Sequence, residues 1–348
     1  MKKIIFFLLL VVTLGLGYFY YEFVSEPNPT LTQEIIVDVA PKTSFKGILN
    51  SLKEQKVDIP EIPAKIAARI FELDKKIHIG EYRITPPLSS LEILKKITNG
   101  KSILRNLLIK EGYNRWDIQN TWQALPYFNS LEFNKLVVDP ELIEKAKIPS
   151  EASILTASNL NMTNAKNFRS LEGYMFPETY SIQKYDSMRS VIAEMLLQFD
   201  GRARDILNKH PWSQSDLGFY RLLTLASIVE KESGNGEEQP LVASVFWNRL
   251  NKKMRLQSDP TTIYGLMPNF DGNLKRIHLT TFGIFNTYKI PELPVGPICN
   301  PGEKALRAVL SPAATPYLYF VSRGDGSHIF AESYKDHDKN VKKFQLKQ

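Results

Sequence analysis

An uninterrupted apolar run from Ile4 to Tyr21 stands near the N-terminus and contains no charged side chain. As a helix rising about 1.5 Å per residue, it would extend for roughly 27 Å, close to the thickness of the hydrocarbon core of a bilayer. Lys2 and Lys3 precede the run, and the positive-inside rule therefore keeps the N-terminus in the cytoplasm. The run predicts a single-pass transmembrane anchor over residues 1–24, with the remainder of the chain outside the cytoplasm.

A cleaved signal peptide is the alternative interpretation of this run. Such a peptide ends in a small-residue cleavage site of the A-x-A type, and none follows here. The run is followed instead by aromatic residues, which are typical of the membrane interface: Tyr18, Phe19, Tyr20, Tyr21 and Phe23. An uncleaved anchor is therefore favoured.

The composition indicates a globular protein of about two domains outside the anchor. The chain has 348 residues, of which 43% are hydrophobic and 23% charged. Its 44 Lys and Arg exceed its 37 Asp and Glu, but the excess is spread along the chain, so no nucleic-acid partner is predicted. Cys299 is the single cysteine and is expected to be a small buried side chain. His328 and His337 lack zinc-like spacing, so neither a metal nor a cofactor is expected.

Residues 25–103 read as a polar, proline-containing linker followed by a small αβ unit. A strand is predicted over 35–39 and a second over 80–84, with helical patterns over about 45–52 and 62–73. Thr43 or Ser44 can cap the first helix, and Ser89 with Glu92 forms a capping box before a third, which Asn99-Gly100 ends.

Residues 104–348 read as a larger mixed domain, so the fold class is α+β. A strand is predicted over 107–109, a hairpin over 317–321 and 328–331, and an irregular segment over 136–160. Asn114, Asp186 and Ser215 are candidate helix caps, and Ser215 with Asp216 opens a long apolar helix that leads to Glu230 and Glu232.

Glu230 and Glu232 follow two apolar stripes of this helix. At about 100° per residue they point to nearly opposite faces, so at most one can enter a given cleft. Burial beside apolar groups raises a carboxyl pKa and keeps the acid able to donate a proton near neutral pH. The simpler alternative is that both are solvated charges at a helix end.

Five segments of the chain resemble those of the YceG-like family of endolytic murein transglycosylases: ASIVEKES, VASVFWNRL, MRLQSDPTTIYG, FNTYKIPELPVGPICNPG and YLYFV. The resemblance covers nearly the whole chain. It implies a LysM-like subdomain within residues 25–103 and a YceG-like catalytic domain over 104–348. In this family the catalytic acid is a glutamate followed by Ser or Thr, which corresponds to Glu232 before Ser233, and Glu230 is then a supporting residue.

The implied reaction cleaves the MurNAc–GlcNAc β-1,4 bond of peptidoglycan without water and leaves a 1,6-anhydroMurNAc end. One carboxyl acts first as acid and then as base, so a second catalytic carboxylate is not required. Asp259 is the candidate for such a second group, and its simpler interpretation is an Asp-Pro turn residue.

Further residues are expected to bind the sugar, because amides and phenols pair with hydroxyl and N-acetyl groups. They are Gln257, Ser258, Asp259, Tyr264, Asn286 and Tyr288, together with Glu172, Tyr174 and Glu178 of LEGYMFPETY. For each, the alternative is a buried polar group that ties loops together.

The resemblance places the protein in the bacterial inner membrane, with peptidoglycan glycan strands as substrate and a peptidoglycan synthase as candidate partner. An inserted helical stretch around Pro60 to Leu73 departs from a compact LysM, so a spacer or docking role stays open beside glycan binding. Two other functions also stay open: a non-catalytic peptidoglycan-binding scaffold, and a hydrolytic muramidase that uses Glu232 with Asp259.

Overall fold

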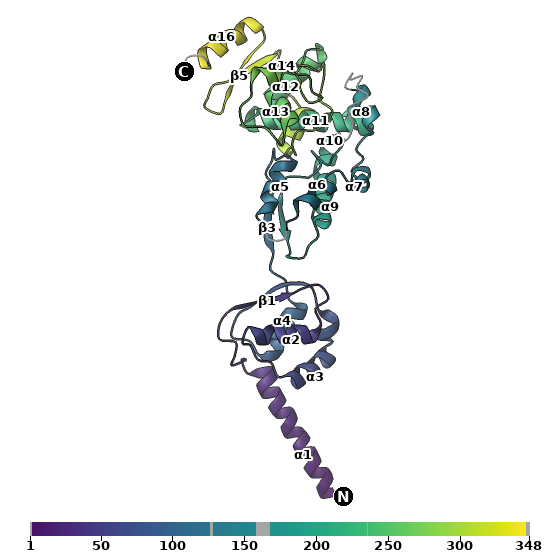
Figure 1. Ribbon diagram of the computed structural model, residues 1–348, viewed down its shortest axis with the longest axis vertical. Coiled ribbons are helices and arrows are strands. Elements are labelled where there is room, and N and C mark those ends of the chain that lie inside the picture. Colours follow the sequence, from purple (N-terminus) through teal and green to yellow (C-terminus); the bar gives the residue numbers. More distant parts are fainter. Residues whose placement is uncertain (1, 126–127, 158–167, 235, 346–348) are drawn as a thin grey trace. The chain divides into compact units, whose positions relative to one another are not determined.

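The computed structural model describes residues 2–125, 128–157, 168–234 and 236–345. The chain forms two compact units (Figure 1). Unit 1 comprises Met1–Asn106 and Ser181–Ser187, and unit 2 comprises Leu107–Tyr180 and Met188–Gln348. Helices predominate, and the strands of the described residues pair two by two, as β1-β2, β3-β4 and β5-β6. The predicted mixture of helices and strands is confirmed.

The N-terminal run forms the helix α1 (Lys2–Phe19), which continues as a π-helical segment, η1 (Tyr20–Ser25). Ile4–Ser25 is the one stretch of the described residues that is long and apolar enough to cross a membrane, and none of its most apolar window is buried in the protein. The helix is compatible with the expected single-pass anchor.

The segment after the helix is not a free linker, contrary to the sequence-based expectation. Phe23 lies in the core of unit 1, and its ring stacks on Phe19 with the centroids 5.3 Å apart. The Asn28 backbone N–H donates to the Leu88 carbonyl (2.8 Å), and its side-chain amide donates to the Ser90 hydroxyl (2.8 Å). These contacts join the helix directly to the body of unit 1.

Unit 1 is a two-stranded sheet packed with helices. Strand β1 (Ile35–Val39) pairs antiparallel with β2 (Gly80–Ile84), with Val37 opposite Tyr82. The remaining elements are α2 (Phe45–Glu54), α3 (Glu61–Phe71), η2 (Leu73–Lys76) and α4 (Ser90–Asn99). Ser44 caps α2, and the predicted capping box of Ser89 and Glu92 at α4 is confirmed.

Residues 181–187 return from unit 2 to unit 1, which the sequence alone did not indicate. Lys184 Nζ lies 2.6 Å from Asp38 and 3.2 Å from Glu81, and the Tyr185 hydroxyl donates to Asp38 (2.8 Å). The Asp186 carboxylate accepts a hydrogen bond from the Gln183 N–H (2.7 Å). Asp186 was expected to cap the next helix, but that helix begins two residues later, at Met188.

Unit 2 is mostly helical. Its elements, with the strands that connect it to unit 1, are β3 (Arg105–Leu108), α5 (Arg115–Gln123), α6 (Ser130–Leu136), α7 (Pro140–Lys145), α8 (Glu151–Ala157), β4 (Thr179–Ile182), α9 (Met188–Phe199), η3 (Asp200–Arg204), α10 (Asp205–Leu207), η4 (Pro211–Gln214), α11 (Asp216–Glu232), η5 (Gly236–Glu238), α12 (Gln239–Asn251), α13 (Asp259–Leu266), α14 (Arg276–Thr280), α15 (Glu303–Leu310), β5 (Tyr319–Ser322), β6 (His328–Ala331) and α16 (Tyr334–Phe344). The short helices α7 and α8 lie in the segment 136–160, whose pattern was irregular and of which residues 158–160 lie outside the described residues.

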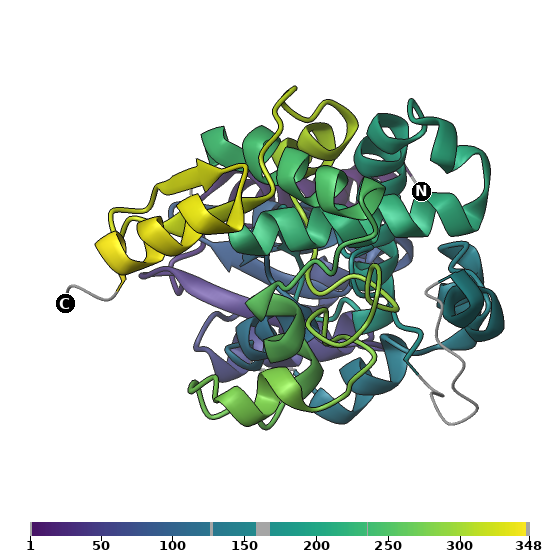
Figure 2. The same cartoon turned by 90° about the horizontal axis from the view of Figure 1, so that it is seen from above.

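The long helix α11 is the core element of unit 2. Ser215 caps it by accepting from the Gly218 N–H (3.1 Å), and its side chains from Leu222 to Val229 are all buried. It packs against α12, α13 and α15. The predicted C-terminal hairpin forms as β5 and β6, and Figure 2 shows this yellow hairpin and α16 together beside the green helices.

Gly173 should be indispensable for the packing of unit 2. Its φ is +88°, and a Cβ there would come within 2.7 Å of the Pro297 ring. Gly272 has a similar φ of +85° but open space around it. We expect Gly173→Ala to lower the unfolding free energy by about 3 kcal/mol and Gly272→Ala by about 1 kcal/mol, measured by denaturant unfolding. Equal decreases in unfolding free energy in the two variants would contradict the predicted clash with Pro297.

Candidate active site

Glu232, the last residue of α11, lines a cleft of about 690 Å³. Three of the residues predicted to bind sugar line the same cleft: Gln257, Asp259 and Tyr288. The rest of the lining comes from α12, from the C-terminal hairpin and from α16: Arg249, Leu256, Tyr319, Phe320, Val321, Ser322, His328, Tyr334, His337, Val341 and Gln345. The cleft is therefore polar and aromatic, with a carboxyl group in its wall.

The environment of Glu232 raises its carboxyl pKa from 4.5 to about 7. The largest cause is desolvation, because the group stands at the end of a buried helix. The negative charge of Asp259 raises the pKa further, whereas the Ser258 hydroxyl and the Arg249 guanidinium lower it. The group can therefore change between acid and carboxylate near neutral pH.

Ser258 is held beside Glu232 by its own backbone. Its N–H donates to the Thr287 hydroxyl (2.9 Å), and its carbonyl accepts from the Thr261 hydroxyl (2.6 Å). Its own side-chain oxygen is buried and has no hydrogen-bond partner within bonding geometry among the described residues. This hydroxyl is thus available to Glu232 or to a bound ligand.

Arg249 connects several walls of the cleft. It lies on α12, and its guanidinium donates to the carbonyls of Leu318 (2.7 Å) and Leu256 (2.7 Å), and lies over the ring of Tyr319. Burial lowers its pKa, but the pKa of a guanidinium is ordinarily high enough to keep Arg249 charged near neutral pH. Arg249 lies in the segment VASVFWNRL, but the sequence alone indicated no role for it.

Asp259 begins α13 rather than standing in an isolated turn. Its carboxylate accepts a hydrogen bond from the Tyr288 hydroxyl (2.7 Å). Desolvation, and to a smaller extent this bond, raises the pKa of Tyr288. Asp259 and Tyr288 thus form a hydrogen-bonded pair in the cleft wall.

The C-terminal residues of the cleft carried no predicted role. His328 is fixed by Glu238, whose carboxylate accepts from the His328 backbone N–H (3.1 Å) and lies 2.7 Å from its Nδ1. Tyr319 and His337 stack on one another, with their centroids 5.1 Å apart. The hairpin itself was predicted from the sequence, but its position beside α12 depends on tertiary packing.

Comparisons with known proteins identify the family of the chain. Residues 37–343 match the family model described as the YceG-like family. The chain belongs to the YceG-like family. It is 31% identical over 268 residues to the endolytic murein transglycosylase of Bacillus subtilis, covering 76% of this chain and 72% of that protein. It is 31% identical over 283 residues to the endolytic murein transglycosylase of Streptococcus pneumoniae, covering 75% of this chain and 50% of that protein.

A crystal structure of a YceG-like protein from Listeria monocytogenes is also similar. Its sequence is 29% identical, its TM-score is 0.56, and the match covers 88% of this chain and 98% of that one. The resemblance drawn from the sequence is confirmed, and with it the expected enzyme class, a lytic transglycosylase.

Glu230 does not line the cleft of this YceG-like protein. Its carboxylate accepts from the Gly302 N–H (3.1 Å), and desolvation raises its pKa. A Cβ on Gly302 would overlap the Glu111 carboxylate, so this glycine lets two acidic side chains approach its backbone. Helix geometry separates the two glutamates as predicted, and Glu230 ties α11 to the start of α15 instead of contacting the cleft.

Glu172 and Tyr264 also have structural contacts away from the cleft. The Glu172 carboxylate is buried and accepts from the Arg115 N–H (3.0 Å), the Tyr264 hydroxyl (3.0 Å) and the Asn300 amide (3.1 Å). Burial raises its pKa to about 7. The two residues therefore connect α5, α13 and the segment before α15, which is the alternative that the sequence left open.

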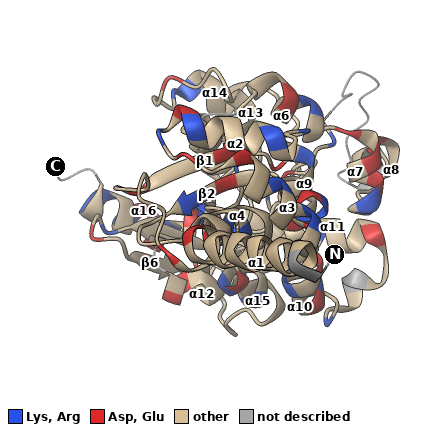
Figure 3. Cartoon of the chain, turned by 90° about the horizontal axis from the view of Figure 1, so that it is seen from below, with Lys and Arg blue, Asp and Glu red and all other residues tan. Residues whose placement is uncertain are grey.

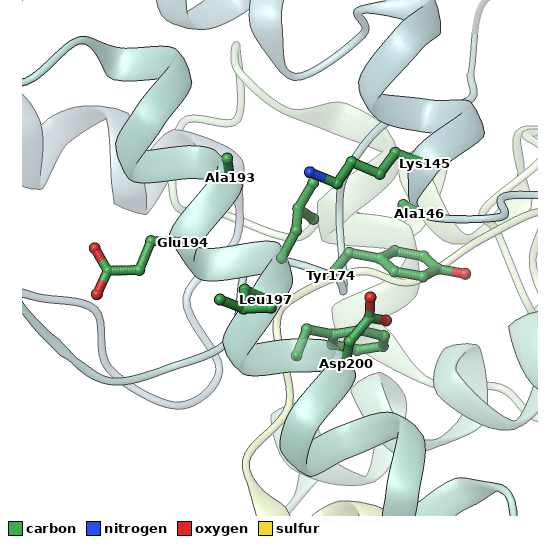
Figure 4. A pocket seen from close by; sticks show the side chains of 9 residues that line it. Lys145, Ala146, Tyr174, Ala193, Glu194, Leu197 and Asp200 are labelled. Carbon is green, nitrogen blue, oxygen red and sulfur yellow. The ribbon is translucent and has the colours of Figure 1, made fainter.

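Three more predicted residues lie outside the cleft. Tyr174 lines a separate cavity of about 260 Å³ with Lys145, Leu197 and Asp200 (Figure 4). Glu178 forms an ion pair with Arg202 (2.8 Å). The Asn286 amide donates to carbonyls at the end of α14, including that of Thr281 (2.7 Å).

Cys299 is buried, as expected. Among the described residues, no three His, Cys, Asp or Glu side chains are grouped so that they could hold a metal ion.

The raised pKa of Glu232 predicts a pH-dependent stability. Because the folded state favours the protonated carboxyl, the stability that this proton contributes is complete below about pH 4.5 and is lost as the pH rises through about 7. We expect Glu232→Gln to increase the unfolding free energy at pH 8 by about 2 kcal/mol and to change it little at pH 4.5. Urea unfolding at the two pH values measures this difference. An equal increase in unfolding free energy at both pH values would show that Glu232 is not desolvated in the folded state.

Proposed function

We propose that the protein is a membrane-anchored endolytic lytic transglycosylase that cleaves MurNAc–GlcNAc β-1,4 bonds in nascent peptidoglycan strands. The observation that carries this proposal is the Glu232 carboxyl at the end of α11, with a pKa of about 7, in a polar and aromatic cleft. The names of the two bacterial relatives support the substrate and the reaction class. Cleavage of this kind terminates or trims a growing strand and leaves a 1,6-anhydroMurNAc end.

In the first step, protonated Glu232 donates its proton to the glycosidic oxygen, and the bond from that oxygen to the MurNAc anomeric carbon breaks. In the second step, the Glu232 carboxylate removes the proton of the MurNAc 6-hydroxyl, whose oxygen bonds to the same anomeric carbon. Glu232 regains in the second step the proton that it gave up in the first. The reaction therefore consumes no water and requires no second carboxylate.

The surrounding side chains suit these two steps. Desolvation favours the protonated acid at the start, whereas Ser258 and Arg249 favour the carboxylate that forms after proton transfer. The opposing effects bring the pKa close to neutral, where one group can serve as both acid and base. The rings of Tyr288 and Tyr319 provide flat surfaces for sugar rings, and Gln257 provides an amide for hydroxyl or N-acetyl groups.

The cellular setting is part of the proposal. The apolar helix α1 would cross the inner membrane once, with its N-terminus in the cytoplasm and the cleft outside. Unit 1 would be a LysM-like subdomain, and a peptidoglycan synthase that supplies new strands would be the partner. The placement of α1 at the start of unit 1 supports an active site that stays attached to the membrane.

A hydrolytic muramidase is the second candidate, because Asp259 lines the same cleft as Glu232. Such an enzyme would use one carboxyl as acid and the other to activate water or to attack the sugar. The Asp259 carboxylate, however, accepts a hydrogen bond from Tyr288, and this bond favours a positioning role.

Product analysis separates these functions. The full chain in detergent is incubated with purified peptidoglycan, and the released fragments are analysed by mass spectrometry. We expect 1,6-anhydro ends, a loss of at least about a thousandfold in Glu232→Gln, and retained anhydro product in Asp259→Asn. Glu230→Gln is the matched control, because its carboxyl lies two residues away on the same helix but outside the cleft.

Reducing ends that disappear in Asp259→Asn would support the muramidase instead. Binding to peptidoglycan without release of fragments would support the non-catalytic scaffold. Full activity in Glu232→Gln would exclude Glu232 as the catalytic acid.

Ser258 should tune the pH dependence of catalysis. Its hydroxyl lowers the pKa of Glu232, so Ser258→Ala should raise that pKa and shift the alkaline limb of the kcat/KM profile to higher pH. Ser244→Ala is the control, because Ser244 is a buried serine bonded to the Leu241 carbonyl (2.7 Å) and is not among the groups that shift the pKa of Glu232. A uniform loss of activity without a shift in the limb would contradict the tuning role.

A further inference from the structure

The helix α3 has an inverted distribution of large and small apolar side chains. Its buried residues are alanines: Ala64, Ala67 and Ala68. Its isoleucines face outward, with 74% of Ile62, 47% of Ile66 and 64% of Ile70 exposed. These isoleucines follow one another at intervals of four residues and therefore form one stripe along the helix. The helix packs on unit 1 through its small side chains and presents its large apolar side chains outward.

The apolar stripe continues into a groove and is flanked by basic residues. The groove has a volume of about 910 Å³ and is lined by Phe45 and Leu49 of α2 and by Ile62 and Ile66 of α3. Lys65 and Arg69 are exposed beside the stripe, and Lys65 is paired with Glu61 one turn away (2.6 Å). The groove is lined by four basic residues, Lys46, Lys65, Arg69 and Lys75, against two acidic ones, Glu72 and Asp74. The surface thus combines exposed apolar side chains with a positive excess.

The candidate membrane helix leads directly to this surface. At about 1.5 Å per residue, Ile4–Ser25 extends for roughly 33 Å and would end at the membrane interface. Phe23 and Asn28 attach the following residues to unit 1 without a free spacer. Within unit 1, α3 lies at the end from which α1 projects, whereas β1 lies at the other end (Figure 1). Figure 3 views the chain from the α1 end, with Lys and Arg segments in blue around α3.

We propose that the isoleucine face of α3 and the adjoining groove dock onto the surface of an anionic phospholipid bilayer beside the anchor. The inference rests on α1 crossing the membrane as proposed above. Isoleucine side chains enter the boundary between headgroups and acyl chains, while Lys65 and Arg69 remain among the anionic headgroups. A glycan strand fits this face less well, because aliphatic side chains offer no partner to sugar hydroxyls. Unit 1 is then attached to the membrane at two points and cannot turn freely about α1.

Spin labels on single introduced cysteines test this contact in the full chain. Cys299 is buried and remains unlabelled in the folded protein. Labels are placed by Ile66→Cys on α3, Leu10→Cys in α1, and Ile36→Cys on β1, where the replaced isoleucine is 48% exposed. Ile36 is the matched control, because it has the same side chain and nearly the same exposure in the same unit. The protein is reconstituted into vesicles of phosphatidylglycerol and phosphatidylethanolamine, and collisions with oxygen and with a water-soluble nickel complex are measured.

At Ile66 we expect an oxygen-to-nickel accessibility ratio at least about three times that at Ile36, because oxygen concentrates in lipid and the nickel complex in water. Lys65→Glu with Arg69→Glu should reduce this ratio, as should vesicles of phosphatidylcholine alone.

A label at position 66 that is as accessible to water as the label at position 36, while the label at position 10 lies in lipid, would overturn the docking and leave the anchor intact. A label at position 10 that is accessible to water would overturn the proposal that α1 is a membrane anchor. Protection of Ile66 only after addition of peptidoglycan or a synthase would assign the face to that partner instead.

Discussion

The desolvation of one carboxyl at the end of a buried helix is the interaction on which the candidate site depends. The side chains of α11 from Leu222 to Val229 are buried, so the helix brings Glu232 out of bulk water before any substrate arrives. An isolated carboxylate is costly in such a place, and the group responds with a raised pKa. Ser258 and Arg249 limit that rise. The balance between burial and these two partners gives a group that can release and recover a proton near neutral pH.

Other buried polar groups of unit 2 hold the cleft walls in place. Glu172 accepts hydrogen bonds from three separate segments, and Glu230 accepts one from the segment before α15. Arg249 donates to carbonyls on two sides of the cleft. Removing one partner from such a network leaves a buried polar group unsatisfied, which costs more than the net gain from one hydrogen bond. Charged residues in this unit thus serve two ends, the chemistry proposed for Glu232 and the rigidity of the surrounding structure.

Unit 1 illustrates how a local pattern gains meaning from its neighbours. The sequence of α3 predicts an amphipathic helix, and the usual expectation is that the isoleucines face the core. The structure buries the alanines instead, because the core of the unit is already filled by side chains such as Leu52, Ile84 and Leu94. The segment after α1 likewise looks like a linker by composition, yet Asn28 binds it to the body of the unit. Both features place an apolar, basic face in the same unit as the candidate membrane helix α1.

Local patterns in the sequence determined the apolar helix α1, the capped helices α2, α4, α5 and α11, and the β5–β6 hairpin. They also determined that Glu230 and Glu232 point in different directions. Periodicity, capping and helix geometry act over a few residues, so the sequence alone can show them. The resemblance to a family singled out Glu232. Only the tertiary structure decided which polar residues reach the cleft: Gln257, Asp259 and Tyr288 line it, whereas Glu172, Tyr264 and Asn286 bind other parts of the protein. It alone brought Arg249, His328 and Tyr319 into the same cleft as Glu232. The reason is physical: these side chains meet through packing between segments far apart in the chain, which no local pattern records.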